Sequence, residues 1–272
     1  MTDPTILPIV IAMLVTSLLA GLVSGLLGVG GGIVLVPVLE FALRYAGVAP
    51  EWCMHMAVAT SSATIIATSV SSARAHHARG AVDWALARSW GPAILIGAFV
   101  GSLLATRARP EWLTAVFGGV ALLVAGRMLL SANEADRSDH VPRGATGAAL
   151  AAALGGVSAM MGIGAGTLGV PTMTALGFPV HRAVGTAAFL GLLVSLPATI
   201  GYLLARPGVA LPWLTVGLVS LVGVALIVPG AILTTSLGAR LAHGLSRTTL
   251  ARVFGVFLLC VAARMFYRTV FN

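Results

Sequence analysis

The sequence contains little charge and no lysine. Only 9% of its 272 residues are charged, and all 16 basic residues are arginines. A water-soluble domain carries roughly 25% charged residues, so this chain lacks the charge to cover a water-facing surface. With 58% hydrophobic residues and a mean hydropathy of +1.01, it is predicted to be an integral membrane protein.

Acidic residues and cysteines are also scarce. The eight carboxylates end at Asp139, which argues against a duplicated cation site in the membrane. Cys53 and Cys260 stand far apart, so neither a disulfide framework nor a metal site is expected. Without a phosphate-binding loop, ATP hydrolysis is excluded and no cofactor is expected. Because the arginines lie mostly between apolar runs, they indicate lipid headgroups as partners, and no nucleic acid.

Ten apolar segments cover most of the chain, and each half reads long, short, long, long, long. A membrane helix needs about 20 mostly apolar residues. The segments are Ile6–Leu27, Ile33–Leu43, His55–Ser72, Trp84–Thr106 and Trp112–Ser131, then Ala145–Met161, Thr167–Phe178, Arg182–Ala205, Trp213–Leu237 and Leu250–Phe271. The first pair of segments in each half reads as one long helix that glycines break.

The two halves share sequence. "SGLLGVGGGIVLVP" (Ser24–Pro37) aligns without gaps on "SAMMGIGAGTLGVP" (Ser158–Pro171), and "HMAVATS" from His55 matches "HRAVGTA" from His181. We therefore predict an all-α membrane protein of two homologous repeats, residues 1–131 and 145–272, joined by a polar linker, 132–144. Each repeat has a Gly-broken or re-entrant first helix followed by three membrane helices.

Each half has five segments, an odd number, which predicts that the second repeat is inverted in the membrane. Ten arginines then fall on the side opposite the N-terminus and six on its own side, which favours both termini outside by the positive-inside rule. If each short segment instead continues its neighbour across the bilayer, the arginines divide evenly and orientation stays open.

The glycine runs are candidate binding sites. Non-helical backbone inside a membrane is tolerated only where protein buries it or where it lines a wet cavity. Each short helix begins with free N–H groups and a partial positive charge, which suits an anion. The predicted site residues are Gly28, Gly30, Gly31 and Gly32 with Gly162, Gly164, Ala165 and Gly166. The alternative is that small residues here allow close helix packing.

Neutral hydroxyls and two histidines complete the predicted site. Thr60, Ser61 and Thr186 follow the glycine motifs and can donate hydrogen bonds to an oxyanion; the alternative is bonding within the helices. His55 and His181 match between the halves and are candidates for proton coupling or substrate contact; the favoured alternative is an interfacial or hydrogen-bonded histidine.

Other polar residues are expected to have structural roles. His76 and His77 are expected to lie solvated in a loop, and Glu40 to pair with Arg44 one helical turn on.

The repeated "GVGGGIVLVP" and "GIGAGTLGVP", each followed by "AVAT" or "AVGT", resemble the sulfite exporter TauE/SafE family of membrane permeases. The resemblance implies a multi-pass carrier in the bacterial inner membrane for sulfite or organosulfonates. Where the family often has three glycines in both copies, the second copy here reads Gly164-Ala165-Gly166. The alternatives are an anion channel and, less favoured, an intramembrane enzyme with Ser24 or Ser158 as nucleophile. A second copy of the chain is a further candidate partner.

The inverted repeat predicts that the linker and the N-terminus lie on opposite sides of the membrane. Single cysteines at Thr2 and Ala132, in a background without Cys53 and Cys260, should react with an impermeant thiol reagent from opposite sides. Labelling of both positions from one side would contradict the inversion.

Overall fold

The computed structural model describes residues 6–28, 30–130, 142, 144–209, 211–212 and 214–244, together with scattered positions between 246 and 263. Most of the predicted linker, 132–144, and most of the predicted segment Leu250–Phe271 lie outside the described residues.

Helices dominate the described part of the chain. They are α1 (Ile6–Leu27), α2 (Gly32–Tyr45), α3 (Pro50–His77), α4 (Trp84–Ala105), α5 (Pro110–Leu130), α6 (Gly144–Met161), α7 (Gly166–Ala175), α8 (Val180–Leu203) and α9 (Leu221–Gly244). A short antiparallel hairpin of β1 (Thr215–Val216) and β2 (Val219–Ser220) precedes α9. The predicted helix over Trp213–Leu237 is therefore wrong at its start, because Gly217 takes a left-handed φ of 58° and turns the chain.

Six of the described helices, all except α2, α5 and α7, are long and apolar enough to cross a membrane. Their outward faces carry large apolar side chains, such as Ile96, 66% exposed, and Leu233, 71% exposed. Exposed apolar surface on this scale suits lipid rather than water. The protein is an all-α membrane protein, as predicted.

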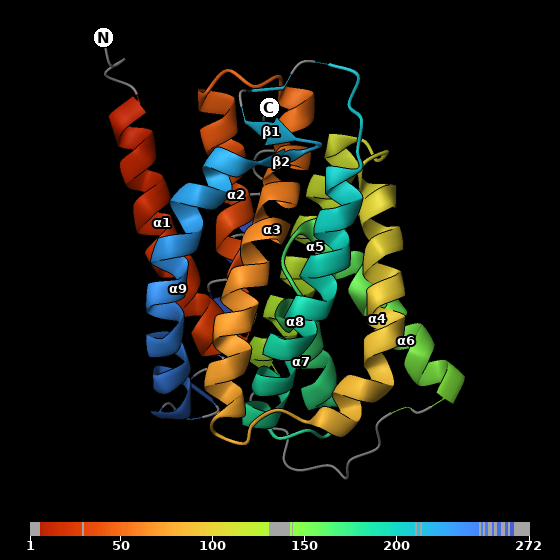
Figure 1. Ribbon diagram of the computed structural model, residues 1–272. Helices are drawn as coiled ribbons and strands as arrows, with labels where there is room; N and C mark the ends of the chain where they lie inside the picture. The colour runs from red at the N-terminus through yellow and green to blue at the C-terminus, as the bar shows by residue number, and fades with distance from the viewer. Residues whose placement is uncertain are drawn as a thin grey trace.

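Helices α3 and α8 form the centre of the bundle (Figure 1). They pack against each other, α9 packs on α3, and α4 packs on α8. Outside them, α1 lies against α9 and α6 lies against α4. In the sequence repeat α1, α3 and α4 correspond to α6, α8 and α9, so each of these helix pairs has a counterpart in the other half.

The outer helix pairs approach closely through glycines. A Cβ at Gly97 or Gly101 of α4 would collide with the backbone of α6, at Ala152 and Gly156. A Cβ at Gly21 or Gly25 of α1 would likewise collide with the backbone of α9. Small residues let helices in a membrane pack at short range, where van der Waals contact replaces the missing hydrophobic drive.

Each half also contains an equivalent hydrogen bond between two of its own helices. His76 Nε2 of α3 lies 2.9 Å from the carbonyl oxygen of Gly25, and the Tyr202 hydroxyl of α8 donates to the carbonyl of Ala159 at 2.8 Å. His76 matches Tyr202 in the sequence repeat, and Gly25 matches Ala159. The prediction that His76 is solvated is wrong: α3 continues to His77, and His76 is only 1% exposed.

Candidate functional site

Two glycine breaks interrupt the bundle, one between α1 and α2 and the other between α6 and α7. Gly28, Gly30 and Gly31 have φ angles of 66°, 76° and 79°, and Gly162 and Gly164 have 63° and 70°. L side chains rarely adopt this left-handed region, so glycine is needed for the chain to turn here. The broken helices predicted from the sequence are confirmed at both places.

The breaks are buried, and each contacts the other half of the chain. A Cβ at Gly32 would collide with the carbonyl oxygen of Gly162, and one at Gly28 with the carbonyl oxygen of Val184. A Cβ at Gly162 would lie 2.6 Å from the carbonyl oxygen of Val58. Close packing, the alternative to a binding role, therefore explains the absence of side chains at these glycines. Whether they also contact a substrate stays a prediction.

Polar side chains of α3 donate to carbonyl groups at the first break and in the last turn of α1. Thr68 donates to Gly30 at 2.9 Å, and Ser72 donates to Ser24 at 3.3 Å. His76 lies on the Gly25 carbonyl, as described above. Ser61 donates to the carbonyl of Gly162 in the second break at 2.7 Å. These four donors share one face of α3, which explains why so apolar a chain has a hydroxyl-rich helix here.

Among the described residues, no side chain caps the start of either short helix. Gly31 precedes α2 and Ala165 precedes α7, and neither residue makes a side-chain capping bond. The first N–H groups of a helix have no acceptor within the helix, and its dipole places about half a positive charge there. Both starts are buried. One carbonyl in each break, that of Gly30 or Gly162, thus has a side-chain donor, and the described starts of α2 and α7 have no side-chain cap.

Thr60 and Thr186 have matching structural roles in the two halves. Thr60 Oγ1 accepts the N–H of Ser220 at 3.0 Å, and Thr186 Oγ1 accepts the N–H of Asp83 at 2.9 Å. Asp83 and Ser220 are the residues from which α4 and α9 begin. Each threonine therefore fixes the start of a helix in the other half of the chain. Because a hydroxyl that accepts can still donate, the predicted contact with substrate remains untested.

The two histidines differ in their surroundings. His55 is 4% exposed, with Nδ1 and Nε2 each 2.9 Å from a backbone carbonyl oxygen, those of Glu51 and Ala108. This arrangement fixes the ring between α3 and the chain that follows α4. His181 lies at the start of α8, partly exposed. A coupling role for either stays a prediction.

The predicted pairing of Glu40 with Arg44 is confirmed, because Arg44 Nη2 lies 3.5 Å from Glu40 Oε1.

The buried hydroxyls that lack hydrogen-bond partners in the described part of the chain include those of Ser24 and Ser158, which the sequence suggested only as nucleophiles, and those of Ser69 and Thr167, which are not among the predicted site residues. Among the described residues, the hydroxyls of Ser24, Ser69, Ser158 and Thr167 are enclosed and unpartnered. All four residues are at most 1% exposed. Such groups are rare in folded proteins, and each calls for a reason. The sequence did distinguish Thr167, because the matching position of the first repeat holds an apolar residue, Ile33.

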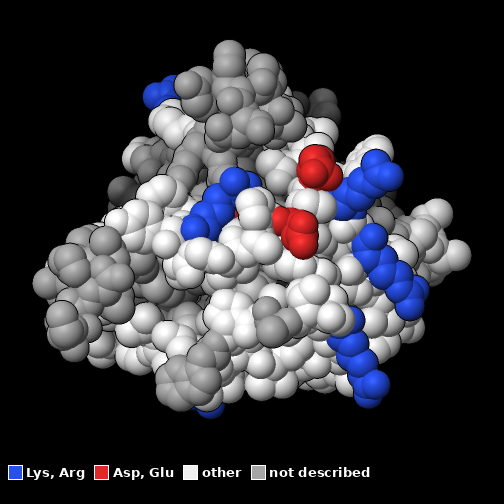
Figure 2. Space-filling model, turned by 90° about the horizontal axis from the view of Figure 1, so that it is seen from above, with Lys and Arg blue, Asp and Glu red and all other residues white. Residues whose placement is uncertain are grey.

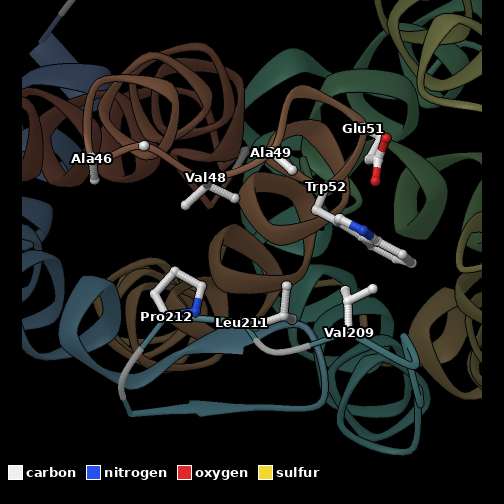
Figure 3. A pocket seen from close by; sticks show the side chains of 9 residues that line it. Ala46, Val48, Ala49, Glu51, Trp52, Val209, Leu211 and Pro212 are labelled. Carbon is white, nitrogen blue, oxygen red and sulfur yellow. The ribbon is translucent and has the colours of Figure 1, made fainter.

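Two pockets open on the face that carries the N-terminus, away from the breaks. One, of about 410 Å³, lies between the loop that follows α2 and the residues Val209, Leu211 and Pro212, with Trp52 beside it (Figure 3). The other, of about 380 Å³, lies beyond Trp52 and has Arg107 and Arg206 in its wall. Figure 2 looks down on this face and shows both basic and acidic side chains around it. Neither pocket includes a predicted site residue.

Comparison with known proteins decides the family. Residues 13–265 match the model of the sulfite exporter TauE/SafE family. The chain belongs to this family. No solved structure matches it.

Several bacterial relatives of the TauE/SafE chain align over almost its whole length. A protein of Haemophilus influenzae named "Probable membrane transporter protein" is 32% identical, over 95% of this chain and 98% of its own. YunE of Bacillus subtilis, also named a probable membrane transporter protein, is 27% identical over 96% and 99%. A probable membrane transporter protein of Xylella fastidiosa is 30% identical over 92% of both chains. The chain is a membrane transporter of the TauE/SafE type.

The geometry of the two threonines predicts a loss of stability when either hydroxyl is removed. Thr60→Val and Thr186→Val each leave a backbone N–H without its acceptor, which should cost about 1 to 2 kcal/mol. Each variant should lower the melting temperature of the purified protein. Thr114→Val is the control, because that hydroxyl bonds only within its own helix. If neither variant melts below the control, the helix-entry role is wrong.

Proposed function

We propose that the chain is a secondary transporter, an exporter, of a small sulfur-containing anion such as sulfite or an organosulfonate. The anion binds at the midplane, between the starts of α2 and α7. The membrane is the inner, plasma membrane of a bacterium. The family supplies the sulfur chemistry and the direction, and the residues at the breaks supply the sign of the charge.

This proposal rests on a difference between the backbone groups at the breaks: carbonyl oxygens accept hydrogen bonds from side chains, but the starts of the short helices have no side-chain cap. Donors on α3 cover carbonyl oxygens of both breaks, for example Thr68 on Gly30 and Ser61 on Gly162. The amide ends of α2 and α7 have no side-chain cap. Oriented N–H groups at a buried helix start attract an anion and repel a cation. The region therefore favours an anion although the described α2 and α7 starts have no arginine among their first residues.

A neutral site also suits release. An arginine buried beside an anion would form a strong, charge-assisted pair, which slows dissociation from a carrier that must turn over. Partial charges of helix starts and hydroxyls attract more weakly. Discontinuous helices whose N-termini face an anionic substrate at the midplane are a known arrangement in secondary transporters.

An inverted repeat supports alternating access around this region. Figure 1 supports the inversion, since α1 begins at the end of the bundle that carries the N-terminus and α6 begins at the opposite end. In Figure 1 the ends of α3 and α9 and the starts of α4 and α8 lie at that opposite end, and Arg74, Arg79, Arg88, Arg182 and Arg240 occur in the sequence near these helix limits. We infer that this face is cytoplasmic, from the positive-inside rule.

Thermal unfolding of the detergent-purified protein in the presence of different solutes tests the proposal. A ligand that binds the native state raises apparent stability, by about 2.7 kcal/mol at a concentration of 100 times its Kd. Sulfite or sulfoacetate should raise the melting temperature, and sodium chloride of equal ionic strength should raise it less. Stabilisation by cations or neutral solutes alone would contradict the anion transporter.

A further inference from the structure

The two glycine breaks occupy matching positions of the repeat but have different neighbours. Ile65 of α3 packs against the first break: its Cγ2 lies 2.6 Å from the position of a Cβ at Gly30, and its Cδ1 lies 2.8 Å from that of a Cβ at Gly32. The residue of α8 that matches Ile65 in the repeat is Gly191. A branched apolar side chain therefore covers the first break, and α8 contributes no side chain at the equivalent place beside the second.

Ser69 of α3 borders the space beside the second break. The position that a Cβ of Gly191 would occupy lies 2.7 Å from Ser69 Oγ and 3.9 Å from the backbone nitrogen of Ala165, which precedes α7. Ser69 is 0% exposed, and its hydroxyl has no hydrogen-bond partner among the described residues. A buried, unused donor thus lies near the uncapped start of α7.

Thr167 adds a second unused donor on the first turn of α7. It is 0% exposed, and its Oγ1 is likewise unpartnered within the described part of the chain. The matching residue in the first repeat is Ile33, which is also fully buried. The first break thus has Ile33 and Ile65 where the second has a threonine and Gly191.

We propose that the second break alone holds the anion, with Ser69 and Thr167 as hydroxyl donors beside the amide groups that begin α7. This assignment rests on the proposed function and selects one of its two helix starts. An enclosed hydroxyl without a partner loses the hydrogen bonds that it makes in water, and an oxyanion offers several acceptor oxygens that restore them. The first break is then a structural counterpart, closed by Ile65 and by the Thr68 bond to Gly30.

Binding of sulfite and sulfoacetate to the full-length purified protein tests this asymmetry. Ser69→Ala and Thr167→Val should each raise the dissociation constant about tenfold, equivalent to 1.4 kcal/mol. The melting temperature without ligand should stay unchanged or rise, because the lost hydroxyls make no hydrogen bond in the protein. This combination separates a ligand-binding hydroxyl from one that stabilises the fold.

Ser195→Ala is the matched control. Ser195 occupies the repeat position of Ser69, and its hydroxyl bonds to Leu192 within α8, so this variant should bind both anions like the wild type. In a second test, Gly191→Ala places a methyl group against Ser69 Oγ and should weaken binding at least as much as Ser69→Ala.

Three outcomes overturn the assignment. Wild-type affinity in both Ser69→Ala and Thr167→Val places the anion elsewhere. A lower ligand-free melting temperature with unchanged affinity means that the hydroxyls hold structural water only. If the wild-type protein shows no anion-dependent stabilisation, the proposed function itself fails, and the site fails with it.

Discussion

Inside a membrane, backbone N–H and C=O groups that are not hydrogen-bonded within a helix need other hydrogen-bond partners, because each unpaired group costs several kcal/mol. The two glycine breaks release carbonyl and amide groups within the bundle, and α3 provides much of the answer. Ser61, Thr68, Ser72 and His76 lie along one face of this helix and reach one carbonyl in each break and two in the last turn of α1. α3 lies at the centre of the bundle, against α2, α8 and α9, where its side chains reach both breaks.

We propose that the region prefers an anion because side chains donate to its carbonyl groups and none caps its helix starts. A serine or threonine can donate to a carbonyl without placing a charge in the membrane. On this proposal, the partial positive charge at the starts of α2 and α7 outweighs that of carbonyls already bonded to Ser61 and Thr68. The preference for an anion would then come from the backbone itself, and the glycines allow that backbone to lie where side chains would otherwise separate it from its neighbours.

Hydropathy and self-comparison predicted most of the architecture from the sequence. The limits of α1 and the glycine breaks follow directly from where apolar runs and flexible residues occur. The hairpin before α9 was missed because Trp213–Leu237 is apolar throughout, and hydropathy alone does not show where a helix begins. His76 was misplaced because its polar neighbours, Arg74 and Arg79, suggested a loop, although α3 continues past it.

The site residues were harder to predict, since comparing the repeats draws attention to what they share. Thr60 and Thr186 match, and the structure gives them a matching role as acceptors at the entries to α9 and α4. A binding site on one side of a pseudo-symmetric protein depends instead on differences, such as Thr167 for Ile33 and Gly191 for Ile65. The significance of these exchanges needs the three-dimensional neighbours, because Ser69 comes to the second break from the first repeat.

The most direct test of the central claim is to locate the bound anion. Selenite resembles sulfite, and its selenium atom scatters X-rays anomalously. In crystals of the wild-type protein grown with selenite, we predict an anomalous peak beside Ser69 at the start of α7 and none at the start of α2. A peak only beside the arginines of the N-terminal face, or at the start of α2, would contradict the account.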